Sequence, residues 1–187
     1  MSNTTLVKGS LSQIAKETGR TLAESWLGVD AVILVDISLS MSDCDARNGM
    51  TRHEVAQEEL IDLQKRVPGK VAIIAFSNDC EFLPNGYLPR PRETTNLTGA
   101  LEYVRVADAI PDMHFIVISD GEPNDESSAL SEARKFRNKI DTIYVGPESG
   151  RAGREFLQKL AKASGGEFLI KPKVAELANG IFGLLGA

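Results

Sequence analysis

Short apolar runs alternate with longer amphipathic segments along most of this chain. The run Ala31–Val35 is continuous and rich in branched side chains, which is typical of a strand covered on both faces in a parallel sheet. The run at 80–83 is short and is predicted to be an edge strand. Including this run, we predict further strands over residues 71–76, 80–83, 114–118, 142–145 and 167–170.

The segments between these runs carry apolar residues at helical spacing. Leu11, Ile14 and Trp26 follow this spacing, so we expect one amphipathic helix that begins near Ser10 and ends at Gly28. An apolar face of this kind more often provides extra packing than a partner surface. Further helices are expected around residues 53–66, from about 97, over 128–139 and 151–163, and from 174.

Strands that alternate with helices predict an α/β fold, because parallel strands need crossover connections that are usually helical. We therefore expect a doubly wound, mostly parallel sheet with helices on both faces. The sequence contains no internal repeat or interdomain linker, and 187 residues with 42% apolar content fit one domain. Sheets of this kind place ligand sites beyond the carboxyl ends of their strands.

Polar side chains follow the first predicted strand. Asp36, Ser38 and Ser40 alternate with Ile37 and Leu39. In an extended segment, residues two apart point in the same direction. We therefore expect the carboxylate and the two hydroxyls to converge, while the two apolar side chains pack inward.

Two other segments supply oxygens of the same kind. Asp120 follows a later strand, and Thr95 stands where a loop enters a helix. Each segment alone could serve only as a turn or a helix cap. Together the three segments predict two carboxylates and three hydroxyls at one edge of the sheet. With water, such a set suits Mg²⁺, and Mn²⁺ or Ca²⁺ are alternatives.

Other metal chemistry has less support. Zinc would favour sulfur or imidazole ligands, and the chain has two histidines, His53 and His114, of which the second begins a strand and is interpreted as structural. Residues 43–49, with Glu54, superficially resemble an EF-hand calcium loop. Arg47 occupies a ligand position there, so we interpret this segment as a solvated loop beside the metal.

The ordered motifs resemble the metal-ion-dependent adhesion site of von Willebrand A (VWA) domains. Asp36-x-Ser38-x-Ser40 is similar to the first motif of that site. Thr95–Leu101 resembles its threonine segment, and Ile118–Pro123 resembles its aspartate segment. Three motifs in the right order make the resemblance specific.

The resemblance runs from about Asp30 to Ile170 and implies a particular architecture. It implies a six-stranded sheet with one antiparallel edge strand, for which residues 80–83 are the candidate. Residues 1–29 would form an N-terminal helical extension, and residues 30–187 would form the VWA domain.

The resemblance also implies the roles of the ligands. Ser38, Ser40 and Thr95 would hold the metal directly, whereas Asp36 and Asp120 would often act through water. A cation held mostly by neutral groups stays a strong Lewis acid with room for a further carboxylate. The function predicted is therefore a metal-dependent protein-interaction module whose partner supplies an Asp or a Glu.

Two other function classes stay open. We predict no enzyme, because no nucleophile with a positioned base is apparent. Asp36, with Asp120 and Asp125 later in the chain, is similar to Mg²⁺-dependent phosphotransferases of the haloacid dehalogenase type, but that family needs a second Asp where Ser38 stands. The third class is a metal-free scaffold that keeps the sheet.

Charge and hydropathy limit the classes of partner and the cellular compartment that are expected. A net charge of -5 argues against nucleic acid and anionic membranes, because both attract an excess of Lys and Arg. The first thirty residues contain no signal-type apolar stretch, so a cytoplasmic protein is expected. The resemblance adds AAA+ ATPases or larger assemblies as candidate partners. Cys44 and Cys80 are interpreted as incidental thiols.

Two expectations concern the surroundings of the site. The loops over residues 41–52, 84–94 and 121–126 would choose among partners through their charges. A closing helix is expected from Val174, with glycines that weaken its helix propensity. The resemblance to VWA domains implies that this helix shifts when the metal site changes its coordination. The loop charges considered are Arg47, Arg52, Arg90, Arg92 and Glu122.

Overall fold

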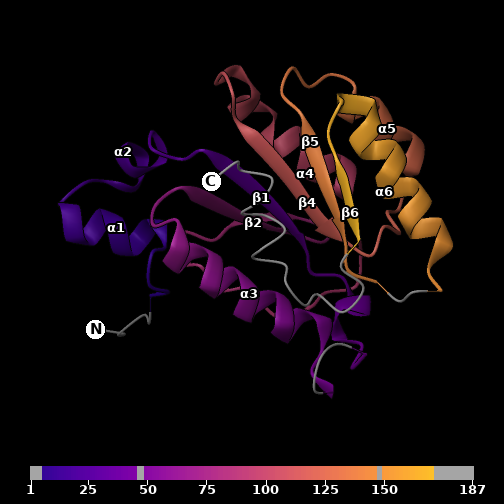
Figure 1. The fold of residues 1–187 in the computed structure, drawn as a ribbon, viewed down its shortest axis with the longest axis horizontal. Helices are drawn as coiled ribbons and strands as arrows, with labels where there is room; N and C mark the ends of the chain where they lie inside the picture. Colours follow the sequence, from indigo (N-terminus) through magenta and orange to yellow (C-terminus); the bar gives the residue numbers. More distant parts are fainter. Residues whose placement is uncertain (1–5, 46–48, 147–148, 171–187) are drawn as a thin grey trace.

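A six-stranded sheet forms the centre of the molecule (Figure 1). The computed structural model describes residues 6–45, 49–146 and 149–170. The sheet has the order β3-β2-β1-β4-β5-β6; β2 and β3 pair antiparallel, and the other neighbouring strands are parallel. The predicted α/β sheet with one antiparallel edge strand is thereby confirmed. The strands are β1 Ala31–Asp36, β2 Val71–Phe76, β3 Cys80–Phe82, β4 His114–Ser119, β5 Ile140–Tyr144 and β6 Phe168–Ile170.

Helices connect the strands and cover both faces of the sheet. The α-helices of the described residues are α1 Leu11–Thr18, α2 Leu22–Trp26, α3 Arg52–Arg66, α4 Leu97–Val104, α5 Glu126–Ala133 and α6 Arg151–Ser164. Two short 3₁₀ helices, η1 Leu39–Ser42 and η3 Arg105–Ala109, follow β1 and α4. None of these helices combines the length and the apolar character needed to cross a membrane.

Alternate residues of the central strands enter two separate hydrophobic clusters. In β1, Val32 and Leu34 join the cluster that contains residues of α4, α5 and α6. Ile33 and Val35 join the cluster that contains residues of α3. All six residues of β1 are buried, as expected for a parallel strand between two helical layers.

The N-terminal segment differs from the expectation of one helix. Gly19 adopts a left-handed φ of 69° and ends α1. Thr21 then starts α2 with a capping box, in which its side chain and that of Glu24 satisfy each other's backbone N–H groups. The prediction of a continuous helix was wrong because a C-cap and an N-cap interrupt the apolar spacing.

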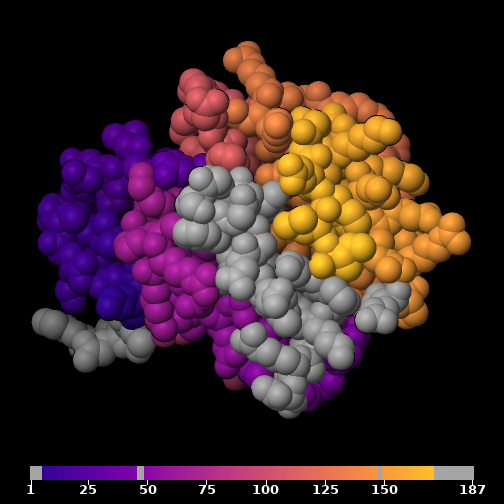
Figure 2. Space-filling model, viewed as in Figure 1, coloured from indigo at the N-terminus to yellow at the C-terminus, as the bar shows by residue number. Residues whose placement is uncertain are grey.

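The same segment packs against the sheet. Leu11 is buried in the cluster with α4, and the backbone N–H groups of Val7 and Ser12 donate to Asn85 and Pro84 at 3.0 and 2.8 Å. Figure 2 shows these indigo N-terminal helices at one end of the molecule and the yellow C-terminal strand and helix toward the other. The apolar face of α1 therefore provides packing in this structure.

Another difference lies after α5, which ends at Ala133 although helix was expected to residue 139. The carboxylate of Asp108 accepts hydrogen bonds from the backbone N–H groups of Arg137 and Asn138 at 2.8 and 2.9 Å. These bonds turn the chain out of helical geometry. The helix expected from Val174 lies outside the described residues.

Candidate metal site

Asp36 ends β1 and is completely buried. Its Oδ1 accepts a hydrogen bond from the backbone N–H of Ser38 at 2.8 Å, and its Oδ2 accepts one from the hydroxyl of Ser119 at 2.7 Å. Val35 pairs with Ile118 across β1 and β4, so the next residues of the two strands face each other. Figure 1 shows β1 and β4 ending at the same edge of the sheet.

The electrostatic surroundings of Asp36 are unfavourable to its negative charge. Burial raises the pKa of this carboxyl to about 6, the hydrogen bond from Ser119 opposes the rise, and the nearby charge of Asp120 adds to it. The hydrogen bonds of Ser38 lower the pKa again. A cation beside Asp36 would therefore offset this unfavourable charge.

The two serines of the first motif lie together as expected. The hydroxyl oxygens of Ser38 and Ser40 are 3.0 Å apart. Ile37 is buried, but Leu39 is 53% exposed, so the expectation that it packs inward was wrong. The strand alternation stops there, because η1 begins at Leu39 and rotates its side chain outward.

Thr95 is buried just before α4, and backbone contacts connect it to the loop that follows β4. Its N–H donates to Oδ1 of Asn124 at 3.3 Å, and its carbonyl accepts from the N–H of Asn124 at 3.0 Å. The N–H of Asn96 donates to the carbonyl of Ser77, directly after β2, at 2.7 Å. Thr95 is thus held beside the segment that carries Asp120.

Asp120 follows β4 and is 7% exposed. The N–H of Gly121 donates to the Ser119 hydroxyl at 2.9 Å. Gly121 has a φ of 79°, and a Cβ there would collide with the carbonyl of Gly153 in α6. A Cβ on Gly153 would in turn collide with the carbonyl of Asp120. Two glycines therefore allow α6 to approach Asp120 closely.

Sequence reasoning missed two residues of this site. Ser119 was visible in the aspartate motif, but its bond to Asp36 depends on the pairing of β1 with β4. Arg52 was expected to be a loop charge available to partners, yet it is 3% exposed. Its guanidinium Nη1 lies 3.5 Å from Oδ2 of Asp120, so that expectation was wrong.

The donor chemistry of this edge fits a hard cation. Two further buried hydroxyls, those of Ser77 and Thr94, are not among the predicted ligands. They have no hydrogen-bond partner within the described part of the chain. Over the same residues, no three side chains of the His, Cys, Asp and Glu types gather as a metal-binding group. His53 instead shares a 2.6 Å hydrogen bond with the carbonyl of Pro89.

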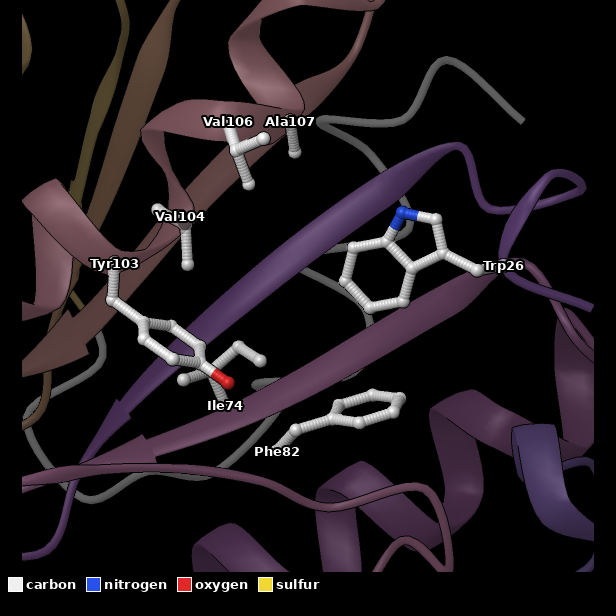
Figure 3. Close-up of a pocket in the computed structure, with 7 residues that line it drawn as sticks. All are labelled: Trp26, Ile74, Phe82, Tyr103, Val104, Val106 and Ala107. Carbon is white, nitrogen blue, oxygen red and sulfur yellow. The ribbon is translucent and has the colours of Figure 1, made fainter. Parts of the chain in front are cut away.

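An apolar pocket of about 330 Å³ lies elsewhere on the molecule (Figure 3). Trp26 and Phe82 meet edge to face in its wall, with ring centroids 5.2 Å apart. None of the five predicted ligands lines this pocket, so it is separate from the candidate metal site. Its lining consists of Trp26, Ile74, Phe82, Tyr103, Val104, Val106 and Ala107.

No protein-family model and no curated protein matches the sequence, but solved structures match the fold. An aerotolerance-related membrane protein from Bacteroides fragilis aligns with a TM-score of 0.63 at 19% identity, over 85% of this chain and 99% of that chain. The vWF domain of the pili tip protein Mfa5 from Porphyromonas gingivalis aligns with a TM-score of 0.61 at 13% identity, over 83% and 96% of the two chains. The manganese-loaded TRAP protein from Plasmodium vivax aligns with a TM-score of 0.53 at 19% identity, over 84% and 71%.

Proposed function

The chain has the fold of VWA domains, and we propose that it is a metal-dependent protein-interaction module. The observation that carries this proposal is the buried carboxylate of Asp36, which two neighbouring segments orient and which lies near the charge of Asp120. The guanidinium of Arg52 lies 3.5 Å from Asp120, whereas the groups that act on Asp36 are Ser119, Ser38 and the like charge of Asp120. A buried carboxylate in such surroundings is costly unless a cation accompanies it. Mg²⁺ is the proposed ion, with Mn²⁺ or Ca²⁺ as alternatives.

The proposed ligands are the five residues of the sequence motifs. Ser38, Ser40 and Thr95 would hold the cation through hydroxyl oxygens, and Asp36 and Asp120 would hold it directly or through water. Hard divalent cations prefer oxygens of this kind. The 3.0 Å separation of the Ser38 and Ser40 hydroxyls suits two ligands of one ion.

The chemistry of this set is that of a binding device. A divalent cation bound there supplies a Lewis-acidic position for a carboxylate of a partner protein. The turn η1 holds the two serines, and the hydroxyl of Ser119 holds Asp36. Because these side chains are already ordered, binding would cost little further conformational entropy. An Asp or Glu of the partner is therefore the proposed recognition element.

The cellular setting is a further part of the proposal. We propose a cytoplasmic assembly, with an AAA+ ATPase as one candidate partner and with neither nucleic acid nor a membrane as a ligand. This part rests on charge and on the resemblance of the motifs. The similar structures include a membrane protein and a pilus tip protein by name, so the compartment stays a prediction.

Calorimetric titration with Mg²⁺ and Mn²⁺ tests the proposed ligand set. We expect one site per chain in the wild type and strongly weakened binding in Thr95→Ala. Ser42→Ala is the matched control, because it removes an exposed hydroxyl from the same turn as Ser40. Excess acetate should displace water from the bound Mn²⁺, which water-proton relaxation detects. Equal metal binding by Thr95→Ala and the wild type would contradict the proposal.

A further inference from the structure

Arg52 is the first residue of α3, and its side chain is buried. A capping box formed by Thr51 and Glu54 fixes this end of the helix. The backbone N–H of Arg52 also donates to the carbonyl of Asp43 at 3.2 Å. The side chain is 4% exposed, so the guanidinium lies inside the loops that surround the candidate metal site.

One edge of the guanidinium binds the loop that follows η1. Nε and Nη2 donate to the two carboxylate oxygens of Asp45 at 2.8 and 2.6 Å, which makes a forked pair. Nη2 also lies 3.2 Å from Oδ2 of Asp43. These contacts fix the plane of the guanidinium.

The remaining nitrogen points toward the candidate ligands. Nη1 donates to the carbonyl of Ser40 at 3.2 Å and lies 3.5 Å from Oδ2 of Asp120. Ser40 belongs to the segment after β1, whereas Asp120 belongs to the segment after β4. Arg52 therefore connects two of the segments that carry metal ligands.

Charge and geometry predict opposite effects of Arg52 on metal binding. A guanidinium beside Asp120 repels a divalent cation, so its loss would tighten binding if Arg52 were only a counter-charge. If Arg52 instead holds Ser40 and Asp120 in place, its loss weakens binding because the ligands lose their arrangement. The sign of the effect separates these two roles.

We propose that Arg52 is a positioning residue of the metal site, which holds Ser40 and Asp120 in the arrangement that binds the cation. This inference rests on the proposed function. Asp45 acts through Arg52, because the forked pair directs Nη1 toward Ser40 and Asp120. The side chains of Asp43 and Asp45 are 62% and 39% exposed, whereas the side chain of Arg52 that they hold is buried.

Titration of the full chain with Mn²⁺ tests whether the loss of Arg52 weakens or tightens metal binding. We expect Arg52→Met to weaken binding by about tenfold to a hundredfold, although it removes a positive charge. Arg52→Lys keeps the charge but loses the fork, so it should weaken binding as well. Arg66→Met is the matched control, because it removes an arginine paired with Asp62 at the other end of α3 and should leave binding unchanged.

A double-mutant cycle tests the path through Asp45. Asp45→Asn should weaken Mn²⁺ binding in the wild type but add little in the Arg52→Met background. Melting temperatures in chelator establish that each variant is folded. Should Arg52→Met fail to fold, Arg52→Lys and Asp45→Asn carry the test, since both keep a polar partner in the site.

The outcomes separate this inference from the proposed function. Absence of Mn²⁺ binding in the folded wild type would contradict both. Wild-type binding together with equal or tighter binding by Arg52→Met would overturn only the positioning role. An effect of Asp45→Asn that is equally large in both backgrounds would show that Asp45 acts by its own charge, and would overturn the path through Arg52.

Discussion

The hydroxyl of Ser119 donates a 2.7 Å hydrogen bond to Oδ2 of Asp36 and so connects the carboxyl ends of β4 and β1. The backbone N–H of Gly121 donates to the same hydroxyl at 2.9 Å. Ser119 therefore orients Asp36 and also fixes the turn that follows Asp120. A residue that binds no metal itself can in this way set the geometry of two proposed ligands.

Replacement of Ser119 by Ala should weaken Mn²⁺ binding by about tenfold, because the carboxylate of Asp36 loses the donor that orients it. Titration calorimetry measures the effect. Ser127→Ala, which changes an exposed serine in the first turn of α5, is the control. Identical affinities of Ser119→Ala and the control would show that Asp36 needs no help from Ser119.

The Asp36 carboxylate should cost stability when no metal is bound. Its pKa is raised from 3.8 in the unfolded chain to about 6, so the folded protein binds this proton more tightly than the unfolded chain does. The stability that this proton provides is present at about pH 4 and is lost as the pH rises through about 6. At pH 7 in chelator, Asp36→Asn should therefore raise the free energy of unfolding, on the order of 2 kcal/mol.

Urea unfolding at pH 4 and pH 7 measures this difference. The increase in the free energy of unfolding caused by Asp36→Asn should be larger at pH 7 than at pH 4. The same variant should lose Mn²⁺ binding. A stability-neutral substitution at both pH values would contradict the assignment of a buried, poorly compensated charge.

Enzymatic hydrolysis of phosphate monoesters is not expected. Asp36 lies beside Ser38 and Ser119, and the hydroxyl of Ser38 stands where a phosphotransferase of the haloacid dehalogenase type needs a carboxylic acid. With Mg²⁺ present, p-nitrophenyl phosphate should react no faster than in the metal-only blank. Reproducible hydrolysis that disappears in Asp36→Asn would favour the enzyme instead.

Strands were the most predictable part of the fold. Ala31–Val35 and residues 71–76 are continuous apolar runs, and the structure extends the first by one residue and keeps the second unchanged. The sequence also contains signals for the break in the first helix, because Thr21 and Glu24 have the spacing of a capping box and Gly19 precedes them. The apolar spacing continues across this break and therefore predicts a continuous helix that the caps do not allow.

Features that depend on distant contacts could not be predicted. The end of α5 depends on Asp108, which precedes the helix in the chain and accepts bonds from residues after it. The guanidinium of Arg52 also lies 3.5 Å from Asp120, which belongs to another strand end. Local patterns carry no information about such pairs. The five proposed ligands stand in the sequence as motifs, and their role stays a prediction. The bond from Ser119 to Asp36 and the contact of Arg52 with Asp120 depend on strand pairing and were not predicted.

The close approach of α6 to Asp120 gives a last prediction. Gly153 lies in the first turn of α6, and a Cβ there would meet the backbone carbonyl of Asp120 rather than a flexible side chain. Gly153→Ala must therefore displace either the helix or the loop of Asp120. We expect weaker Mn²⁺ binding and a lower melting temperature, although Ala favours helix over Gly.

Gly28→Ala is the matched control, because a Cβ there would make only an ordinary contact of 3.6 Å with the carbonyl of Ser25. This variant should keep its metal affinity. Helix propensity alone would make Gly153→Ala more stable than the wild type, whereas the collision makes it less stable, so the sign of the change in melting temperature decides between them. A more stable Gly153→Ala with unchanged Mn²⁺ affinity would show that α6 does not constrain the loop that carries Asp120.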